Sequence, residues 1–181
     1  MDIQNLLNSI FFPRKSDYEI DDKDHLVSVD NDTSVGIRLF IKDVSYPTIL
    51  FFHANAEITH EYDDIAEMYN QYNINFIVSG YRGYGISNGT PTMQSSLDDS
   101  LKIFSYVREH LEKTNNTNKL ILMGRSLGST STCHIMSNNE EEFDGAIIDS
   151  GFATEYPFLL RFGVDPESID FKLTDGFNNL E

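Results

Sequence analysis

A serine lies between two glycines in the stretch LILMGRSLGST, residues 120–130, directly after a short apolar run. Gly124, Ser126 and Gly128 form the pattern G-x-S-x-G. At a sharp turn from a strand into a helix, such a serine exposes its hydroxyl and can attack a carbonyl carbon. Side chains at the two glycine positions would collide with the neighbouring strand and helix. The pattern therefore predicts a nucleophilic serine, and its alternative role is a serine that caps a helix.

An attacking serine needs hydrogen-bond donors for the negative charge that develops on the carbonyl oxygen. The backbone N–H of Leu127, at the start of the helix, is predicted to be one donor. The second donor is expected from the loop HANAE, residues 53–57, which follows an apolar run. Within that loop the N–H of Asn55 is predicted to donate. His53 is expected to brace the loop through a backbone hydrogen bond.

A serine hydroxyl also needs a general base, and the base needs an acid that orients it. Asp149, at the end of the strand after the serine loop, is the best-placed acid, and a structural carboxylate is its alternative. His53 and His60 lie near the expected sheet edge and are weak candidates for the base. His134 follows Ser126 along one helix by eight residues, or about 12 Å, which is too far. The sequence therefore shows a nucleophile without a clear base.

Alternating strands and helices must position these loops. Strands are predicted at 25–30, 34–42, 48–53, 74–80, 119–124 and 143–151, and helices at 60–73, 93–113 and 126–138. The first two strands are joined by the turn NDT and are expected to form an antiparallel hairpin. The remaining order predicts an α/β fold with a mostly parallel sheet and helices on both faces. Ligands of such sheets bind beyond the carboxyl ends of the strands, where the serine loop and HANAE lie.

The chain is expected to form one core with two flanking segments. These are an N-terminal segment at 1–24, the core at 25–153, and an irregular lid-like or connecting tail at 154–181. Within the N-terminal segment an amphipathic helical stripe is made by Ile3, Leu6, Leu7 and Ile10. This stripe is expected to dock on the core, with a membrane surface or a partner as alternatives.

The composition excludes several classes of partner. The formal net charge of -16 argues against nucleic acid and anionic membranes, because both require a basic protein surface. A single cysteine, Cys133, excludes an intrachain disulfide and a zinc cluster of thiolates. No apolar run is long enough for an integral membrane span, and no signal peptide is recognised. A cytoplasmic protein is expected. No cofactor or metal is predicted. The glycine-rich loop GYGISNG does not fit a dinucleotide site, because no helix follows it directly.

Four stretches together carry a resemblance to a known superfamily. In chain order they are ILFFHANAE, GYRGYGISNGTPT, LILMGRSLGS and GAIIDSGFAT. They resemble the α/β hydrolases, and within them the serine hydrolases that include ABHD13-, ABHD17- and Bem46-like proteins. The similarity runs from about Val27 to Phe152. The resemblance implies a serine esterase, lipase or thioesterase that acts on small-molecule or lipid acyl substrates.

Carried over by residue, the resemblance gives Ser126 the place of the nucleophile, and Asn55 and Leu127 the places of the oxyanion donors. In this superfamily the acid and the histidine follow the serine in the chain. No suitable histidine follows Ser126 here, so the chain is expected to lack a C-terminal part of about 60 to 90 residues. The strand at 143–151 would then form an exposed edge, open to self-association or to a partner chain. The alternative function is a non-catalytic pseudo-hydrolase that binds acyl ligands.

Overall fold

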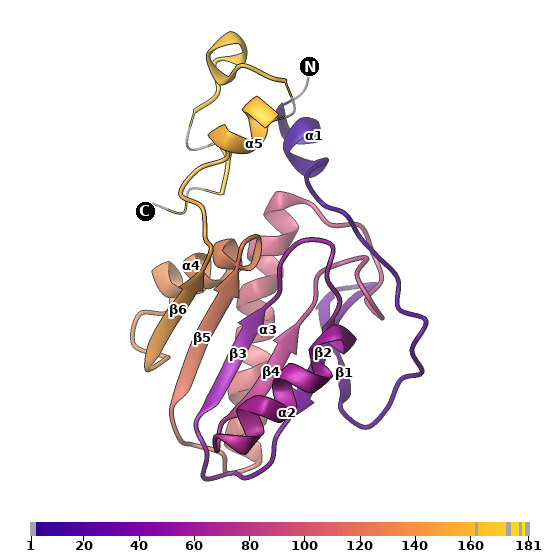
Figure 1. Cartoon of the computed structure of the whole chain (residues 1–181), viewed down its shortest axis with the longest axis vertical. Helices are drawn as coiled ribbons and strands as arrows, with labels where there is room; N and C mark the ends of the chain where they lie inside the picture. Colours follow the sequence, from indigo (N-terminus) through magenta and orange to yellow (C-terminus); the bar gives the residue numbers. More distant parts are fainter. Residues whose placement is uncertain (1–2, 162, 173–174, 178, 180–181) are drawn as a thin grey trace.

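A six-stranded sheet runs through the centre of the molecule (Figure 1). The computed structural model describes residues 3–161, 163–172, 175–177 and 179. The strands are β1 (Asp24–Asp30), β2 (Thr33–Phe40), β3 (Thr48–Phe52), β4 (Asn75–Ser79), β5 (Leu120–Arg125) and β6 (Gly145–Asp149). Their spatial order is β1-β2-β4-β3-β5-β6. The pairs β1–β2 and β2–β4 are antiparallel, and β4, β3, β5 and β6 run parallel. The predicted hairpin and mostly parallel sheet are confirmed.

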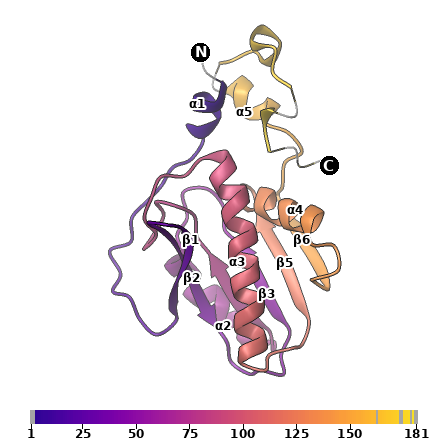
Figure 2. The same ribbon diagram turned by 180° about the vertical axis from the view of Figure 1, so that it is seen from behind.

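Helices cover both faces of the sheet. The helices are α1 (Ile3–Asn8), α2 (Asp63–Gln71), α3 (Met93–Lys113), α4 (Gly128–Asn138) and α5 (Tyr156–Arg161), with short 3₁₀ helices η1 (Thr59–Tyr62) and η2 (Pro166–Ile169). Helix α2 crosses the face seen in Figure 1, and α3 and α4 cover the opposite face, seen in Figure 2. The side chain of Thr92 starts α3 by accepting a hydrogen bond from the Ser95 N–H.

Two of the apolar runs form strands, β3 and β4, that are buried on both faces. Every residue of β3 and of β4 is buried. On one face Leu50 packs in a cluster with Phe104 of α3. On the other face Phe51 packs in a cluster with Phe76 and Ala66, the last of which lies on α2. This arrangement explains why these strands are continuous apolar runs and do not alternate with polar residues.

Most predicted bounds agree with the structure, and three predictions need correction. The helix predicted at 60–73 begins as the 3₁₀ turn η1, and its α-helical part starts at Asp63. The tail is not irregular throughout, because it contains α5 and η2, and Leu159 of α5 is buried. The helix predicted at 126–138 begins at Gly128, after the serine turn.

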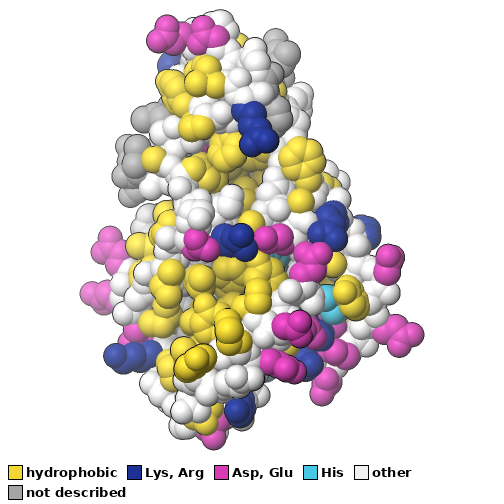
Figure 3. Space-filling model, viewed as in Figure 1, with side chains coloured by type: hydrophobic (Ala, Val, Ile, Leu, Met, Phe, Trp, Pro, Cys, Tyr) yellow, Lys and Arg dark blue, Asp and Glu magenta, His cyan; other side chains and the backbone are white. Residues whose placement is uncertain are grey.

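The last strand, β6, is an open edge in the part of the chain that the structure describes. It pairs with β5 only. Ile147 and Ile148 are 44% and 45% exposed, although both stand on a strand of a mostly parallel sheet. Figure 3 shows hydrophobic side chains gathered on the front face, over the region of β5 and β6. The prediction of an apolar exposed edge is confirmed.

Candidate active site

Ser126 lies at the turn between β5 and α4, beyond the carboxyl end of β5. Its φ of 50° places it in the left-handed region, which costs a non-glycine residue about 1–3 kcal/mol. Two backbone hydrogen bonds hold this conformation. The Ser126 N–H donates to the Asp149 carbonyl at 3.0 Å, and the Ser129 N–H donates to the Ser126 carbonyl at 3.0 Å. The turn is therefore fixed by both the neighbouring strand β6 and the first turn of α4.

The two glycines of the motif are required by close packing. A Cβ atom on Gly124 would overlap the carbonyl group of Gly128. A Cβ atom on Gly128 would overlap the carbonyl group of Phe52, in β3. In both cases the clash is with backbone, which cannot rotate away as a side chain can. The sequence prediction that these positions exclude side chains is confirmed.

The loop after β3 brings Asn55 to the same cavity as Ser126 and Leu127. The Ala54 N–H donates to the Glu57 carboxylate at 2.8 Å, and this bond closes the loop. Within the described residues, the backbone N–H groups of Asn55 and Leu127 donate to no backbone carbonyl outside the helices and strands. An oxyanion site requires N–H groups that are free to donate.

The side chain of Asn55 ties the N-terminal segment to this loop. Its Nδ2 donates to the Ile10 carbonyl at 2.5 Å, and its Oδ1 accepts from the Phe12 N–H at 3.0 Å. The Tyr84 hydroxyl also donates to this Oδ1, at 2.7 Å. Ile10 is buried in an apolar cluster with Leu6, whereas the side chains of Ile3 and Leu7 lie outside the described part of the structure. The segment thus docks on the core, as expected.

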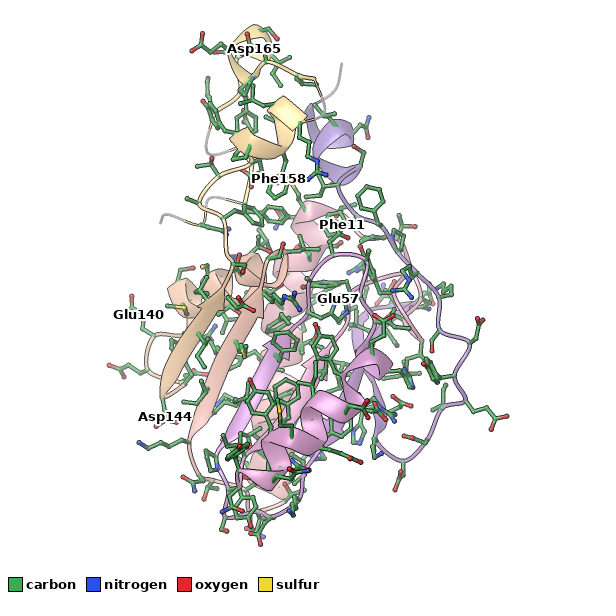
Figure 4. All side chains as sticks on the ribbon, viewed as in Figure 1. Phe11, Glu57, Glu140, Asp144, Phe158 and Asp165 are labelled. Carbon is green, nitrogen blue, oxygen red and sulfur yellow. The ribbon has the colours of Figure 1, made fainter. Side chains whose placement is uncertain are left out.

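A cavity of about 400 Å³ opens at Ser126. It is lined by Ile10, Phe12, Asn55, Ser126, Leu127, Phe152, Phe158 and Arg161. Figure 4 shows Phe158 below α5, between the tail and the core, and Phe11 on the neighbouring N-terminal segment. Most of the wall is apolar, so the cavity suits a hydrocarbon chain.

Sequence reasoning identified only part of this cavity. It predicted Ser126, Leu127 and Asn55 at one site and a lid-like or connecting tail at 154–181, but it did not place the N-terminal segment there. The amphipathic stripe, which includes Ile10, predicted that the N-terminal segment docks on the core, but it did not predict at which site. No pattern within that tail identified Phe158 as a residue that lines the cavity of Ser126.

His53 braces the loop after β3 through hydrogen bonds, as expected. Its Nδ1–H donates to the Ala54 carbonyl at 2.8 Å, and its own carbonyl accepts from the Tyr81 hydroxyl at 2.7 Å. Its ring packs edge-on against Tyr81 with centroids 4.9 Å apart. Complete burial lowers the pKa of the imidazole below its usual value, so the neutral form is favoured.

His60 belongs to a buried charged cluster away from the serine. Its Nε2 lies 3.3 Å from the Asp24 carboxylate, and its ring stacks on Tyr18 at 4.9 Å. The Asp24 carboxylate also pairs with Arg38 at 3.0 Å. These contacts give His60 a structural role in the charged cluster, so they do not support the role of a base for Ser126.

The remaining candidates do not complete a triad. The Asp149 carboxylate lies 3.7 Å from the Arg125 guanidinium and accepts a hydrogen bond from the Ser150 hydroxyl at 2.9 Å. Among the residues that the structure describes, no histidine side chain hydrogen-bonds to Ser126 or to Asp149. The five histidines are His25, His53, His60, His110 and His134. Two of them pair with each other elsewhere, since the rings of His25 and His110 lie 5.3 Å apart.

Comparison with known proteins decides the family. Residues 45–158 match the hydrolase family described as serine aminopeptidase, S33. The chain belongs to this family of α/β hydrolases. The match includes β3, the Ser126 turn and β6, so the predicted superfamily is confirmed.

Curated relatives are similar over part of their length. The chain is 31% identical to protein bem46 of Schizosaccharomyces pombe over 113 residues, which cover 61% of this chain and 36% of that protein. It is 29% identical to the lysophosphatidylserine lipase ABHD12 of Bos taurus over 134 residues, covering 67% of this chain and 32% of that protein. The chain thus spans less than half the length of these relatives.

The fold is also found among solved structures. A soluble variant of monoglyceride lipase from Saccharomyces cerevisiae, in complex with a substrate analogue, aligns with a TM-score of 0.62 at 14% identity. The alignment covers 87% of this chain and 52% of that one. None of the helices in the described ranges combines the length and the apolar character that a bilayer-spanning segment requires.

Proposed function

We propose that the chain carries the nucleophilic half of a serine hydrolase that cleaves carboxylic esters or thioesters through an acyl-Ser126 intermediate. One observation carries the proposal: Ser126 projects from a strained turn into an apolar cavity that Asn55 and Leu127 also line. The relatives named as lipases act on acylated glycerol compounds, which agrees with an apolar acyl site.

In the proposed reaction the Ser126 Oγ gives its proton to a base and attacks the carbonyl carbon. The negative charge that forms on the carbonyl oxygen is stabilised by the N–H groups of Asn55 and Leu127. Collapse of this tetrahedral intermediate breaks the bond to the alcohol or thiol, which leaves with a proton. Water then cleaves the acyl-serine by the same steps.

For the described residues acting alone, esters and thioesters are better substrates than amides. A leaving amine must be protonated by the histidine of a triad, whereas an alkoxide with electron-withdrawing groups or a thiolate departs more readily. Since none of the five histidines contacts Ser126, the residues described here activate the serine poorly. We expect the oxyanion donors and the cavity alone to give a modest rate, about 10³- to 10⁴-fold above that in water.

An exogenous base tests this proposal. Imidazole can enter the cavity and take the Ser126 proton, so the initial rate with 4-nitrophenyl butyrate should rise with imidazole concentration. The Ser126→Ala variant is the matched control, because it measures the reaction of imidazole with free ester. A difference of at least tenfold between the two proteins, with a butyryl adduct on Ser126 in mass spectrometry, is expected.

Equal rates for the two proteins at every imidazole concentration would overturn the catalytic proposal. The alternative is a pseudo-hydrolase that binds acyl ligands without turnover. This alternative is supported by the observation that none of the five histidines contacts Ser126. In that case butyrate and longer fatty acids bind, but no adduct forms with the ester or with a fluorophosphonate.

A further inference from the structure

Arg161 differs from the other arginines in lacking an acidic partner. The chain has six arginines. Five of them form ion pairs with carboxylates, namely Arg14, Arg38, Arg82, Arg108 and Arg125. Arg161 has no carboxylate within ion-pair distance in the ranges that the structure describes. Arg161 is also exposed.

The position of Arg161 connects it with the candidate active site. It is the last residue of α5 and lines the same cavity as Ser126. Apart from Asn55 and Ser126, the rest of that lining is apolar, including Phe152 and Phe158. A cation at the end of a helix is favoured by the helix dipole, but α5 has only 6 residues and its dipole is small. The dipole does not explain why Arg161 lies at this cavity.

We propose that Arg161 binds an anionic group, a phosphate or a carboxylate, on the acyl substrate. The inference rests on the proposed function, since it adds the substrate class to the same site. The apolar wall takes the hydrocarbon chain, Ser126 faces the ester carbonyl, and Arg161 pairs with the anion. A guanidinium suits this role because it stays charged and can bind two oxygens at once. The substrate class is therefore an amphiphilic acyl ester with one anionic group.

Two pairs of ligands test the proposal by calorimetry. The first pair, 1-octanoylglycerol 3-phosphate and 1-octanoylglycerol, differs by a phosphate on the leaving group. The second pair, monomethyl octanedioate and methyl octanoate, differs by a carboxylate on the acyl chain. Binding is measured in the Ser126→Ala variant, so that no ligand is consumed. At least one anionic member should bind tenfold or more tightly than its neutral partner, and the pair that responds shows where the anion sits.

Variants at Arg161 decide whether this residue is responsible. In the Ser126→Ala background, Arg161→Gln should abolish the preference, and Arg161→Lys should retain part of it. Lys172→Gln removes one positive charge from the same tail, outside the cavity lining, and should leave the preference unchanged. This control separates a local contact from the effect of net charge.

Three results would overturn the inference: no preference in either pair, a preference that survives Arg161→Gln, or inorganic phosphate binding as tightly as the acyl phosphate. The readout is binding to a protein without the Ser126 hydroxyl. A failed imidazole experiment therefore rejects catalysis and leaves this test intact. Conversely, loss of the anion preference leaves the imidazole result unchanged.

Discussion

The carboxamide of Asn55 holds the backbone of Ile10 through a 2.5 Å hydrogen bond, although 45 residues separate the two in the chain. The same side chain accepts the Phe12 N–H, so one residue joins the proposed oxyanion loop to the N-terminal wall of the cavity. A change in the docking of the N-terminal segment therefore changes the shape of the site.

Replacing Asn55 by alanine tests this coupling. The Asn55→Ala variant keeps the backbone N–H of the loop and removes the donor to the Ile10 carbonyl. The Phe12 N–H loses one of two acceptors and keeps the Tyr84 hydroxyl, 2.9 Å away. We expect the Phe12 amide to exchange with solvent at least tenfold faster, because the lost contacts cost about 1–3 kcal/mol. Hydrogen exchange with mass spectrometry measures the rate. Asn118→Ala, at an exposed loop asparagine, is the control and should leave this exchange unchanged.

Arg38 is the centre of the buried charged cluster beside β1. Its guanidinium pairs with Asp63 at 2.8 Å and with Asp24 at 3.0 Å, and the Asp24 side chain is fully buried. Arg38→Gln should lower the free energy of unfolding by about 3–5 kcal/mol, because it leaves buried negative charge uncompensated. Urea denaturation measures the loss. Arg108→Gln breaks an exposed pair with Glu142 and should cost less than about 1 kcal/mol; equal losses would contradict the argument.

The decrease in the free energy of unfolding at acidic pH should depend in part on Asp21. The hydrogen bond from the Arg38 guanidinium lowers the pKa of this carboxyl from 3.8 to about 2. The folded state therefore binds fewer protons than the unfolded state between these two pH values. The contribution is complete above about pH 4 and is lost as the pH falls towards 2. Between pH 5 and 2 the free energy of unfolding, measured by denaturation, should change less with pH in Asp21→Asn than in the wild-type chain. An equal pH dependence in the two proteins would contradict the link to Asp21.

Gly128 should not accept a side chain. Gly128→Ala places a methyl group against the Phe52 carbonyl and is expected to destabilise the fold by about 1–3 kcal/mol, the usual cost of overpacking. It should also move the Ser126 turn and reduce the imidazole-dependent rate. Gly145→Ala is the matched control, since its nearest neighbour would lie at an ordinary 3.5 Å. Comparable melting temperatures for the two variants would disprove the packing argument.

The open edge of β6 predicts self-association along the sheet. Ile147→Lys adds a charge to the exposed apolar face and should shift the chain towards monomer in analytical ultracentrifugation. Association should increase with salt, because salt screens the net charge of -16. Val44→Lys, at another exposed apolar residue in a loop, should change little. A monomeric wild-type chain at high salt and high concentration would show that the edge does not self-associate.

The sequence predicted the elements well where a pattern extends over many residues. Helix α3 was expected at 93–113 and has these bounds, because its apolar residues recur at helical spacing over 21 residues. The buried strands β3 and β4 were found as continuous apolar runs. Helix α5 was missed, since 6 residues are too few for periodicity to distinguish a helix from a loop.

The sequence by itself determined the turn at Ser126, because a strand, two glycines and a helix start are local features that follow one another in the chain. Within residues 127–181 it also leaves His134 as the one histidine after the serine, eight residues further along the same helix. Only the tertiary structure decided that Ile10 and Phe12 meet Phe158 and Arg161 around the serine. These residues come from opposite ends of the chain, and their convergence depends on long-range packing and on hydrogen bonds such as those of Asn55. Such contacts leave no periodic pattern in the sequence.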